Sequence, residues 1–175
     1  MGRGLRDVSG IEALSGWHSV DVLDDKSIVS LDPVDLMISS RIDLPVEHIY
    51  MLTQAPGVVD DGPAWMIAYH VDTFDEDGMR QTRRPVGYLD PALGPNPIVV
   101  IEDPGHHPSD IVFVPNYPAG RFGTVYVSMP GKKRNDPTDD RLFAATLVFD
   151  GTTVGVEGEP RVLTDLESWS EPIGM

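Results

Sequence analysis

The sequence contains no cysteine. Disulfide bridges, thiolate metal sites and a thiol nucleophile are therefore excluded, although the absence of cysteine fits either redox compartment. Basic residues are also scarce, with 13 Lys and Arg against 28 Asp and Glu and a formal net charge of −15. That charge repels phosphate backbones and anionic bilayers, so we expect neither nucleic-acid nor membrane binding.

Long apolar runs are missing as well. No run in the sequence approaches the ~20 residues of a membrane-spanning helix. The N-terminal MGRGLRDVSG carries arginines without an apolar segment behind them, so no secretory signal is expected. We expect a soluble protein, cytoplasmic by default. The length of 175 residues and a hydrophobic fraction of 41% fit a single globular domain with a buried core.

What the sequence does have is glycine and proline throughout, 17 and 16 residues, which break long helices. The segments between them are short and rich in Val, Ile, Tyr and Phe, which favour strands. No window shows a helical period, so the predicted fold class is all-β. Strands are predicted at His18–Leu23, Ser27–Leu31, Val34–Ser39, Ala64–Val71, Pro85–Leu89, Ile98–Glu102, Asp110–Val114, Thr124–Met129, Leu142–Phe149, Thr153–Glu157 and Arg161–Leu163.

The connections between these strands also carry information. Asp150-Gly151 is a hairpin turn dipeptide between two predicted strands. Phe74–Arg84 and Pro130–Asp140 are polar and are predicted to be long hairpin loops within the domain. A rough repeat of an aromatic strand, a long loop and two further strands spans roughly 40–50 residues, which is the size of a four-stranded propeller blade.

The order of several short motifs resembles the last blades of five-bladed β-propeller glycosidases, most closely those of glycoside hydrolase family 43. A blade of that family opens with Glu-Ala-Pro and continues through a turn into an aromatic strand. The corresponding residues here are Gln54-Ala55-Pro56, Ala64–His70, Val86-Gly87-Tyr88, Leu93-Gly94-Pro95, Gly105-His106, Arg141 and Phe149-Asp150-Gly151. The resemblance implies a partial β-propeller of two to three four-stranded blades within residues 1–175. A β-sandwich or barrel is the alternative for the same strand spacing.

Gln54 stands at the position of the family's general acid. Inverting glycoside hydrolysis needs a protonated carboxylic acid for the leaving oxygen and a carboxylate that activates water. A glutamine keeps the shape of glutamate and can hydrogen-bond sugar, but it has no proton to donate. The blades that carry the family's base and modulating aspartates have no counterpart in this sequence. The resemblance therefore implies a degenerate or truncated relative that does not by itself hydrolyse arabinose- or xylose-containing glycans.

Other residues are candidates for the same carbohydrate-facing site. His106 matches a family histidine near the central channel that helps to hold a metal ion through water. Trp65 could stack on a sugar ring, although its position in a strand favours core packing. Arg141, ahead of an apolar strand, is expected to bind substrate. The resemblance places Gln54 at the N-terminal end of its blade's innermost strand, with His106 nearby; the alternatives are a loop amide and a turn histidine.

No cofactor is expected. The oxygen-rich Asp72–Gly78 suggests calcium, but it departs from the EF-hand pattern and is better explained as a solvated acidic loop. Carbohydrate is one predicted partner. Further copies of the chain or the missing blades are another, because two or three blades leave sheet faces open. The competing functional class is a non-enzymatic structural or assembly protein, such as a virion or oligomeric shell component.

Overall fold

The computed structural model describes residues 8–13, 20–32, 34–59, 62–102, 108–115, 121–129 and 141–165. Every regular element in these ranges is a strand, which confirms the all-β prediction for the described part of the chain. It contains no helix of the length and apolar character that a membrane crossing requires. The strands are β1 (Val8–Ala13), β2 (Val20–Asp24), β3 (Ser27–Leu31), β4 (Ile38–Asp43), β5 (His48–Pro56), β6 (Pro63–Phe74), β7 (Arg80–Arg83), β8 (Val86–Leu89), β9 (Ile98–Ile101), β10 (Asp110–Pro115), β11 (Arg121–Met129), β12 (Arg141–Phe149), β13 (Val154–Val156) and β14 (Arg161–Asp165).

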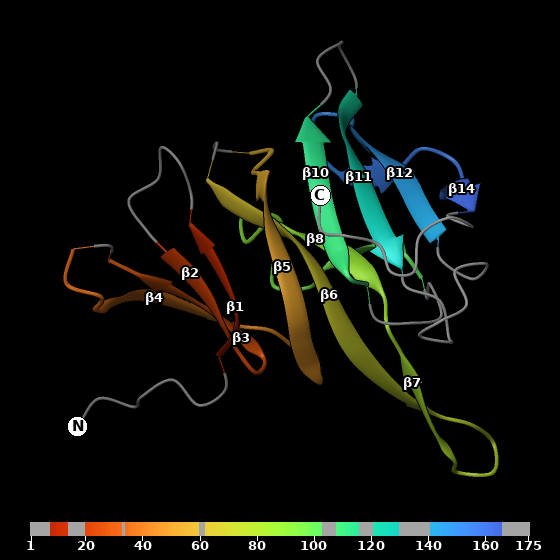
Figure 1. Cartoon of the computed structure of the whole chain (residues 1–175), viewed down its shortest axis with the longest axis horizontal. Coiled ribbons are helices and arrows are strands. Elements are labelled where there is room, and N and C mark those ends of the chain that lie inside the picture. Colours follow the sequence, from red (N-terminus) through yellow and green to blue (C-terminus); the bar gives the residue numbers. More distant parts are fainter. Residues whose placement is uncertain are drawn as a thin grey trace.

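The strands form three antiparallel sheets (Figure 1). The first sheet has the order β1-β2-β3-β4, and the second has the order β5-β6-β8-β9 with β7 beside β6. The third has the order β10-β11-β12-β13 with β14 beside β12. Each sheet is therefore a meander whose four main strands follow one another along the chain, apart from the short β7 between β6 and β8.

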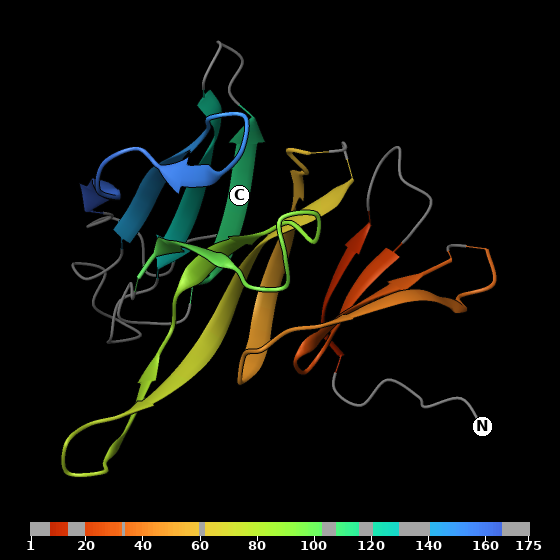
Figure 2. The same ribbon diagram turned by 180° about the vertical axis from the view of Figure 1, so that it is seen from behind.

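The second sheet lies between the other two, as the view from behind also shows (Figure 2). Residues along β6 alternate between its faces. Trp65 and Ile67 pack with Ile28 of the first sheet, whereas Met66 belongs to the core shared with Val125 of the third sheet. Both faces are buried, which is why Ala64–Tyr69 is apolar at every position instead of alternating with polar residues.

The first strands of the three sheets are neighbours. β5 contacts β1 of the first sheet and β10 of the third sheet. The three meanders therefore stack face to face with their leading strands on the same side of the molecule. β5 therefore contacts both of the other sheets.

The predicted hairpin at Asp150-Gly151 is confirmed. It joins β12 and β13, which pair from Leu147 to Phe149. Gly151 has a φ of 95°, in the left-handed region that favours glycine. The Asp150 carboxylate accepts the backbone N–H groups of Thr152 and Thr153, each at 2.8 Å. These hydrogen bonds, Thr153 first, lower the pKa of Asp150.

One predicted strand is wrong over most of its length. Val34–Met37, predicted as strand, forms a turn, and β4 begins only at Ile38. The Asp32 carboxylate accepts the N–H of Val34 at 2.7 Å, and that of Asp35 accepts the N–H of Met37 at 2.9 Å. Aspartates that bond to the backbone two residues on stabilise turns, and they outweigh the strand preference of the apolar residues here.

Three strands were not predicted from the sequence: β1, β5 and β7. β7 is entirely polar, Arg-Gln-Thr-Arg, and becomes a strand through its pairing with β6. It converts part of the predicted loop Phe74–Arg84 into a hairpin. The other predicted long loop, Pro130–Asp140, lies outside the described residues.

Candidate functional site

Gln54 lies near the C-terminal end of β5, two residues before the strand ends at Pro56. Its predicted place at the N-terminal end of an innermost strand is therefore wrong, because β5 already begins at His48 and pairs with β6 along its length. The Cα partner of Gln54 is Trp65, and directly opposed residues in an antiparallel ladder share a face. The Gln54 side chain is partly exposed.

The Ala-Pro-Gly segment after Gln54 is held by specific contacts. Ala55 is buried in the core between the second and third sheets. The carbonyl of Pro56 accepts a hydrogen bond from the Tyr88 hydroxyl at 2.8 Å. Gly57 donates its N–H to the carbonyl of Gly62 at 3.1 Å, and a Cβ on Gly57 would lie only 2.7 Å from that oxygen. Glycine is therefore required where the turn closes.

Asp90 fixes the same turn from the end of β8. It is 4% exposed, and its two oxygens accept the N–H groups of Val58 and Ala92, each at 2.9 Å. The Tyr88 hydroxyl lies 3.3 Å from the same carboxylate. Burial, followed by the charge of Asp90, raises the pKa of Tyr88 far above its ordinary value. Both Asp90 oxygens accept backbone N–H groups, so this carboxylate positions the turn that follows Gln54.

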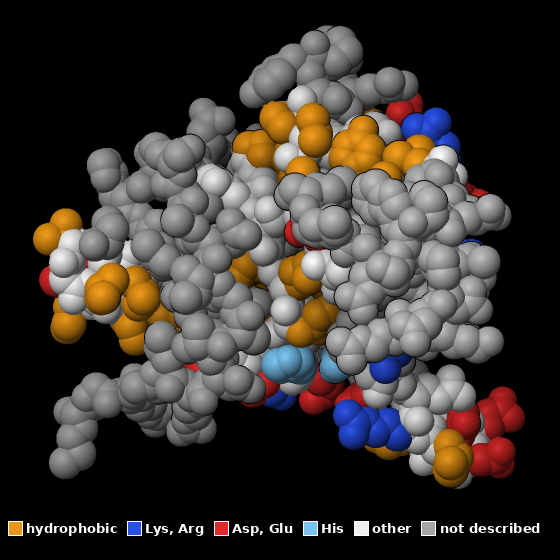
Figure 3. All heavy atoms as spheres, in the orientation of Figure 1, with side chains coloured by type: hydrophobic (Ala, Val, Ile, Leu, Met, Phe, Trp, Pro, Cys, Tyr) orange, Lys and Arg blue, Asp and Glu red, His pale blue; other side chains and the backbone are white. Residues whose placement is uncertain are grey.

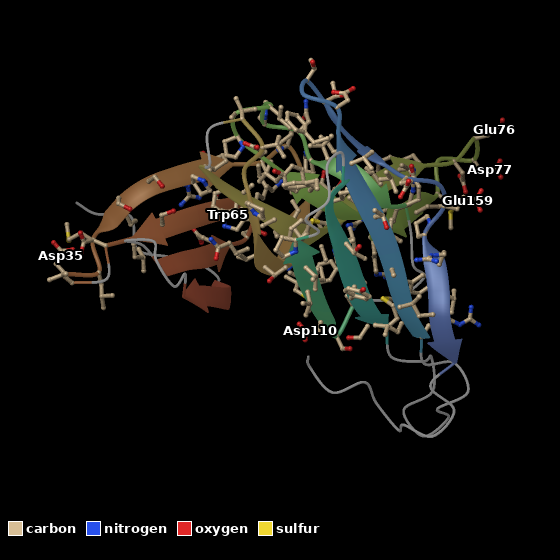
Figure 4. All side chains as sticks on the ribbon, turned by 90° about the horizontal axis from the view of Figure 1, so that it is seen from above. Asp35, Trp65, Glu76, Asp77, Asp110 and Glu159 are labelled. Atoms are coloured by element: carbon tan, nitrogen blue, oxygen red, sulfur yellow. The ribbon has the colours of Figure 1, made fainter. Side chains whose placement is uncertain are left out.

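Trp65 does not belong to the candidate site. The side chain is 0% exposed and packs in the cluster that includes Leu52 and Leu89. Figure 4 places it between the first and second sheets. No face of the indole is open to a sugar ring, so the predicted stacking is not made and the core alternative holds.

Arg141, the other candidate among the described residues, does not join Gln54. Arg141 is exposed and opens β12 in the third sheet, where its Cα partners are Met129 and Asp165. His106 lies outside the described residues. Of the sequence-predicted residues that the structure describes, only Gln54 and Trp65 are brought together, and they meet as ladder partners.

A second cluster, which the sequence analysis missed, lies at the other end of β5. His48 and His70 are Cα partners, and their ring centroids are 5.7 Å apart. The Tyr50 ring lies 5.0 Å from that of His70 and 6.5 Å from that of His48. Figure 3 shows histidine side chains of the described residues together at one edge of the molecule. The spacing of His48 and His70 in the sequence could have revealed the pair only if β5 had been predicted.

The histidine cluster also joins two sheets. His48 Nδ1 lies 3.1 Å from Asp25 Oδ1 in the turn between β2 and β3. Beside it, Lys26 Nζ lies 3.6 Å from Glu47 Oε2, and Ile49 donates its N–H to the carbonyl of Asp25 at 2.9 Å. The role of the His48–Asp25 pair is to hold the turn of the first sheet against β5.

In the acidic loop suggested as a calcium site, Asp75 uses its carboxylate oxygens within the loop. Asp75 Oδ1 accepts the N–H groups of Asp77 at 3.1 Å and Met79 at 2.8 Å. Gln81 Nε2 lies 3.3 Å from the other oxygen of Asp75. In the part of the chain that the structure describes, no group of three or more His, Asp or Glu side chains is placed to hold a metal ion.

Comparison of the chain with protein-family models, with curated proteins and with solved structures found no match. The candidate site is therefore defined by its geometry. It consists of a partly exposed amide on β5 and the turn after it, which Asp90, Tyr88 and Gly57 hold in place. Such a site can donate and accept hydrogen bonds, and Gln54 has no ionisable proton to transfer.

Proposed function

We propose that the chain forms three blades of a β-propeller that binds carbohydrate without hydrolysing it. The observation that carries this proposal is the stacking of three meanders that follow one another in the chain. The first strand of the middle meander, β5, contacts the first strands of the other two, β1 and β10. Propeller blades pack face to face around an axis lined by one strand from each blade. A two-sheet sandwich does not account for a middle sheet that is buried on both faces.

Gln54 is the proposed sugar contact because of where β5 places it. The strand is the leading strand of the middle blade, and the amide is partly exposed next to a turn tied to β8. A rigid turn lowers the entropy cost of binding. An amide donates to and accepts from sugar hydroxyls, but it does not protonate a leaving oxygen. The resemblance to family 43 indicates arabinose- or xylose-containing glycans as the ligand class.

Titration with arabino- and xylo-oligosaccharides, followed by amide chemical shifts, tests this proposal. We expect shifts to concentrate at Gln54 and in the Ala55–Val58 segment. Gln54→Ala should weaken binding about three- to tenfold, as the loss of a hydrogen bond predicts. Gln81→Ala on β7 is the matched control and should leave binding unchanged. The proposal fails if neither sugar series shifts these amides.

The described residues form three sheets, and none of these is a further blade against the outer face of the first or the third sheet. We propose that further copies of the chain, or the remaining blades of a longer chain, cover these two faces. Light scattering and calorimetry on the isolated chain should then not give a stable monomer. A monodisperse monomer that unfolds cooperatively would count heavily against the open propeller.

A structural or assembly role is the second candidate, and one surface favours it. In the turn between β3 and β4, Val34, Leu36 and Met37 are 91%, 65% and 66% exposed. Leu36 has a φ of 58°, an unfavourable backbone conformation for a bulky residue. If this turn mediates assembly, the double substitution Leu36→Ser with Met37→Ser should abolish the assembly that sedimentation velocity measures. The result of the oligosaccharide titration should stay unchanged.

A further inference from the structure

The strand β6 continues past the rest of its sheet. It pairs with β5 from Pro63 to His70 and with β8 from Trp65 to Ala68. In the described ladders, Val71–Phe74 pairs with β7. Residues 71–83 therefore form a two-stranded hairpin, the β6–β7 arm, which projects away from the three sheets (Figures 1 and 2).

Side-chain contacts hold the β6–β7 arm in shape. Arg80 Nη2 lies 2.6 Å from Asp72 Oδ2, and the Thr82 hydroxyl donates to Asp72 Oδ1 at 2.7 Å. Hydrogen bonds from Arg80 and then Thr82 lower the pKa of Asp72. At the turn, the Asp75 carboxylate accepts the N–H groups already described. A free two-stranded hairpin is marginal in water, so these contacts keep a projecting arm ordered.

The outer end of the arm presents large apolar side chains to solvent. Phe74 is 70% exposed and Met79 is 66% exposed, and they lie on either side of the turn. Neither side chain belongs to the two hydrophobic clusters of the described residues. Phenylalanine and methionine are enriched in the buried centres of protein interfaces.

The charge around these side chains restricts what can bind them. The turn carries three carboxylates, on Asp75, Glu76 and Asp77, and Figure 4 shows Glu76 and Asp77 at the outer end of the arm. The nearby arginines are engaged, Arg80 with Asp72 and Arg83 with Glu102. The exposed end is therefore both apolar and negatively charged, and complementary charge on a partner would favour docking.

A second copy of this chain is poorly suited to that end. Each copy has a net charge of −15. The basic run Lys132-Lys133-Arg134 is followed within six residues by the three aspartates Asp136, Asp139 and Asp140. We propose that the β6–β7 arm docks onto a different protein, whose contact surface has apolar side chains edged by lysine or arginine.

The test uses the whole chain and three synthetic peptides as probes. One peptide combines lysine with leucine, the second replaces leucine with serine, and the third replaces lysine with glutamate. Affinity is measured by fluorescence anisotropy at about 150 mM salt, where long-range attraction is screened. Amide chemical shifts locate the contact. We expect the lysine–leucine peptide to bind at least about tenfold more tightly than the others, with shifts centred on Phe74–Met79.

Substitutions separate the apolar contribution from the charge. Phe74→Ser with Met79→Ser should weaken binding of the lysine–leucine peptide about tenfold, the loss expected when interface anchors are removed. Both side chains are exposed, so the fold should persist in circular dichroism. Val34→Ser with Leu36→Ser removes similar apolar groups from the β3–β4 turn and should leave the affinity unchanged. Glu76→Gln with Asp77→Asn should weaken binding and reduce its salt dependence.

Three results would overturn the proposal. The first is equal affinity for the lysine–leucine and lysine–serine peptides, because it would show that charge attraction alone accounts for the binding. The second is self-association of the protein that Phe74→Ser abolishes, because the occupant is then a second copy. The third is binding to vesicles of neutral lipid through Phe74 and Met79, which makes the occupant a lipid surface.

Discussion

The carboxylate of Asp90 accepts the backbone N–H of Val58 at 2.9 Å and thereby ties the end of β8 to the turn that follows Gln54. The Tyr88 hydroxyl strengthens this link by donating to the carbonyl of Pro56 at 2.8 Å. The candidate site is therefore shaped by residues about 32 positions further along the chain. A rigid turn at this place is what the proposed sugar contact of Gln54 requires.

Asp90→Ala should lower the free energy of unfolding by about 2–4 kcal/mol, because it removes a buried carboxylate and leaves the N–H groups of Val58 and Ala92 without their acceptor. Urea unfolding measures the change. Asp77→Ala, at the exposed end of the β6–β7 arm, is the control and should change stability by less than about 0.5 kcal/mol. Equal effects of the two substitutions would show that the turn does not depend on Asp90.

Gly57→Ala should destabilise the protein by about 1–3 kcal/mol, because the added methyl group meets the backbone of Gly62 in the turn. The nearest atom, the carbonyl oxygen of Gly62, is 2.7 Å from the position of the new Cβ. At Gly155 the nearest atom is 3.9 Å away, so Gly155→Ala is the matched control. Calorimetry should show a lower unfolding temperature for the first variant and little change for the second.

Neither the unaltered protein nor Gln54→Glu should hydrolyse aryl arabinosides or aryl xylosides. A general acid contributes ~10²–10⁴-fold to such a reaction. The resemblance to glycoside hydrolase family 43 implies that the catalytic base is missing from this sequence, so we expect that restoring the acid is not enough. Release of nitrophenol from the two substrates measures the activity. Robust turnover by the unaltered protein would refute the proposal of a non-hydrolytic site.

Asp43 should contribute to the pH dependence of stability. Hydrogen bonds from Ser27 Oγ at 2.6 Å and Arg41 Nε at 2.8 Å lower its pKa. The Asp43 carboxylate therefore binds a proton more weakly in the folded state than in the unfolded state. The stabilisation is complete above the unfolded-state pKa of about 4 and is lost as the pH falls through the lower folded-state pKa. The side chain is 75% exposed, so solvent screening keeps the effect small.

Asp43→Asn tests this prediction in urea unfolding at a series of pH values. The variant should be less stable than the unaltered protein at neutral pH, and the difference should shrink below about pH 4. Asp77→Asn controls for the loss of one negative charge. A difference that grows as the pH falls has the wrong sign for a lowered pKa and would contradict the assignment.

Some of the fold follows from short stretches of sequence. Ala64–Val71 and Leu142–Phe149 were predicted as strands and lie in β6 and β12. Both are rich in residues that favour strands. The Asp150-Gly151 turn was also predicted, because an aspartate that bonds to the next backbone N–H groups and a glycine with positive φ act within a few residues.

The candidate site could be predicted from the sequence only in part. Gln54 was singled out through a resemblance, but its place near the end of β5 was missed, as was the His48–His70 pair. Both errors come from β5, whose strand structure was not predicted. The sequence pattern of Glu47–Pro56 mixes polar residues with a terminal proline, and the ladder with β6 is what makes it a strand.

The sequence by itself determined the all-β class and the negative charge of the protein, since strand preference, turn chemistry and ionisable groups are properties of residues and their near neighbours. Only the tertiary structure decided that Trp65 is core, that Arg141 lies in a different sheet from Gln54, and that β6 extends into an arm. These outcomes depend on which strands pair and which sheet faces meet. Pairing joins residues far apart in the chain, so no single stretch of sequence specifies it.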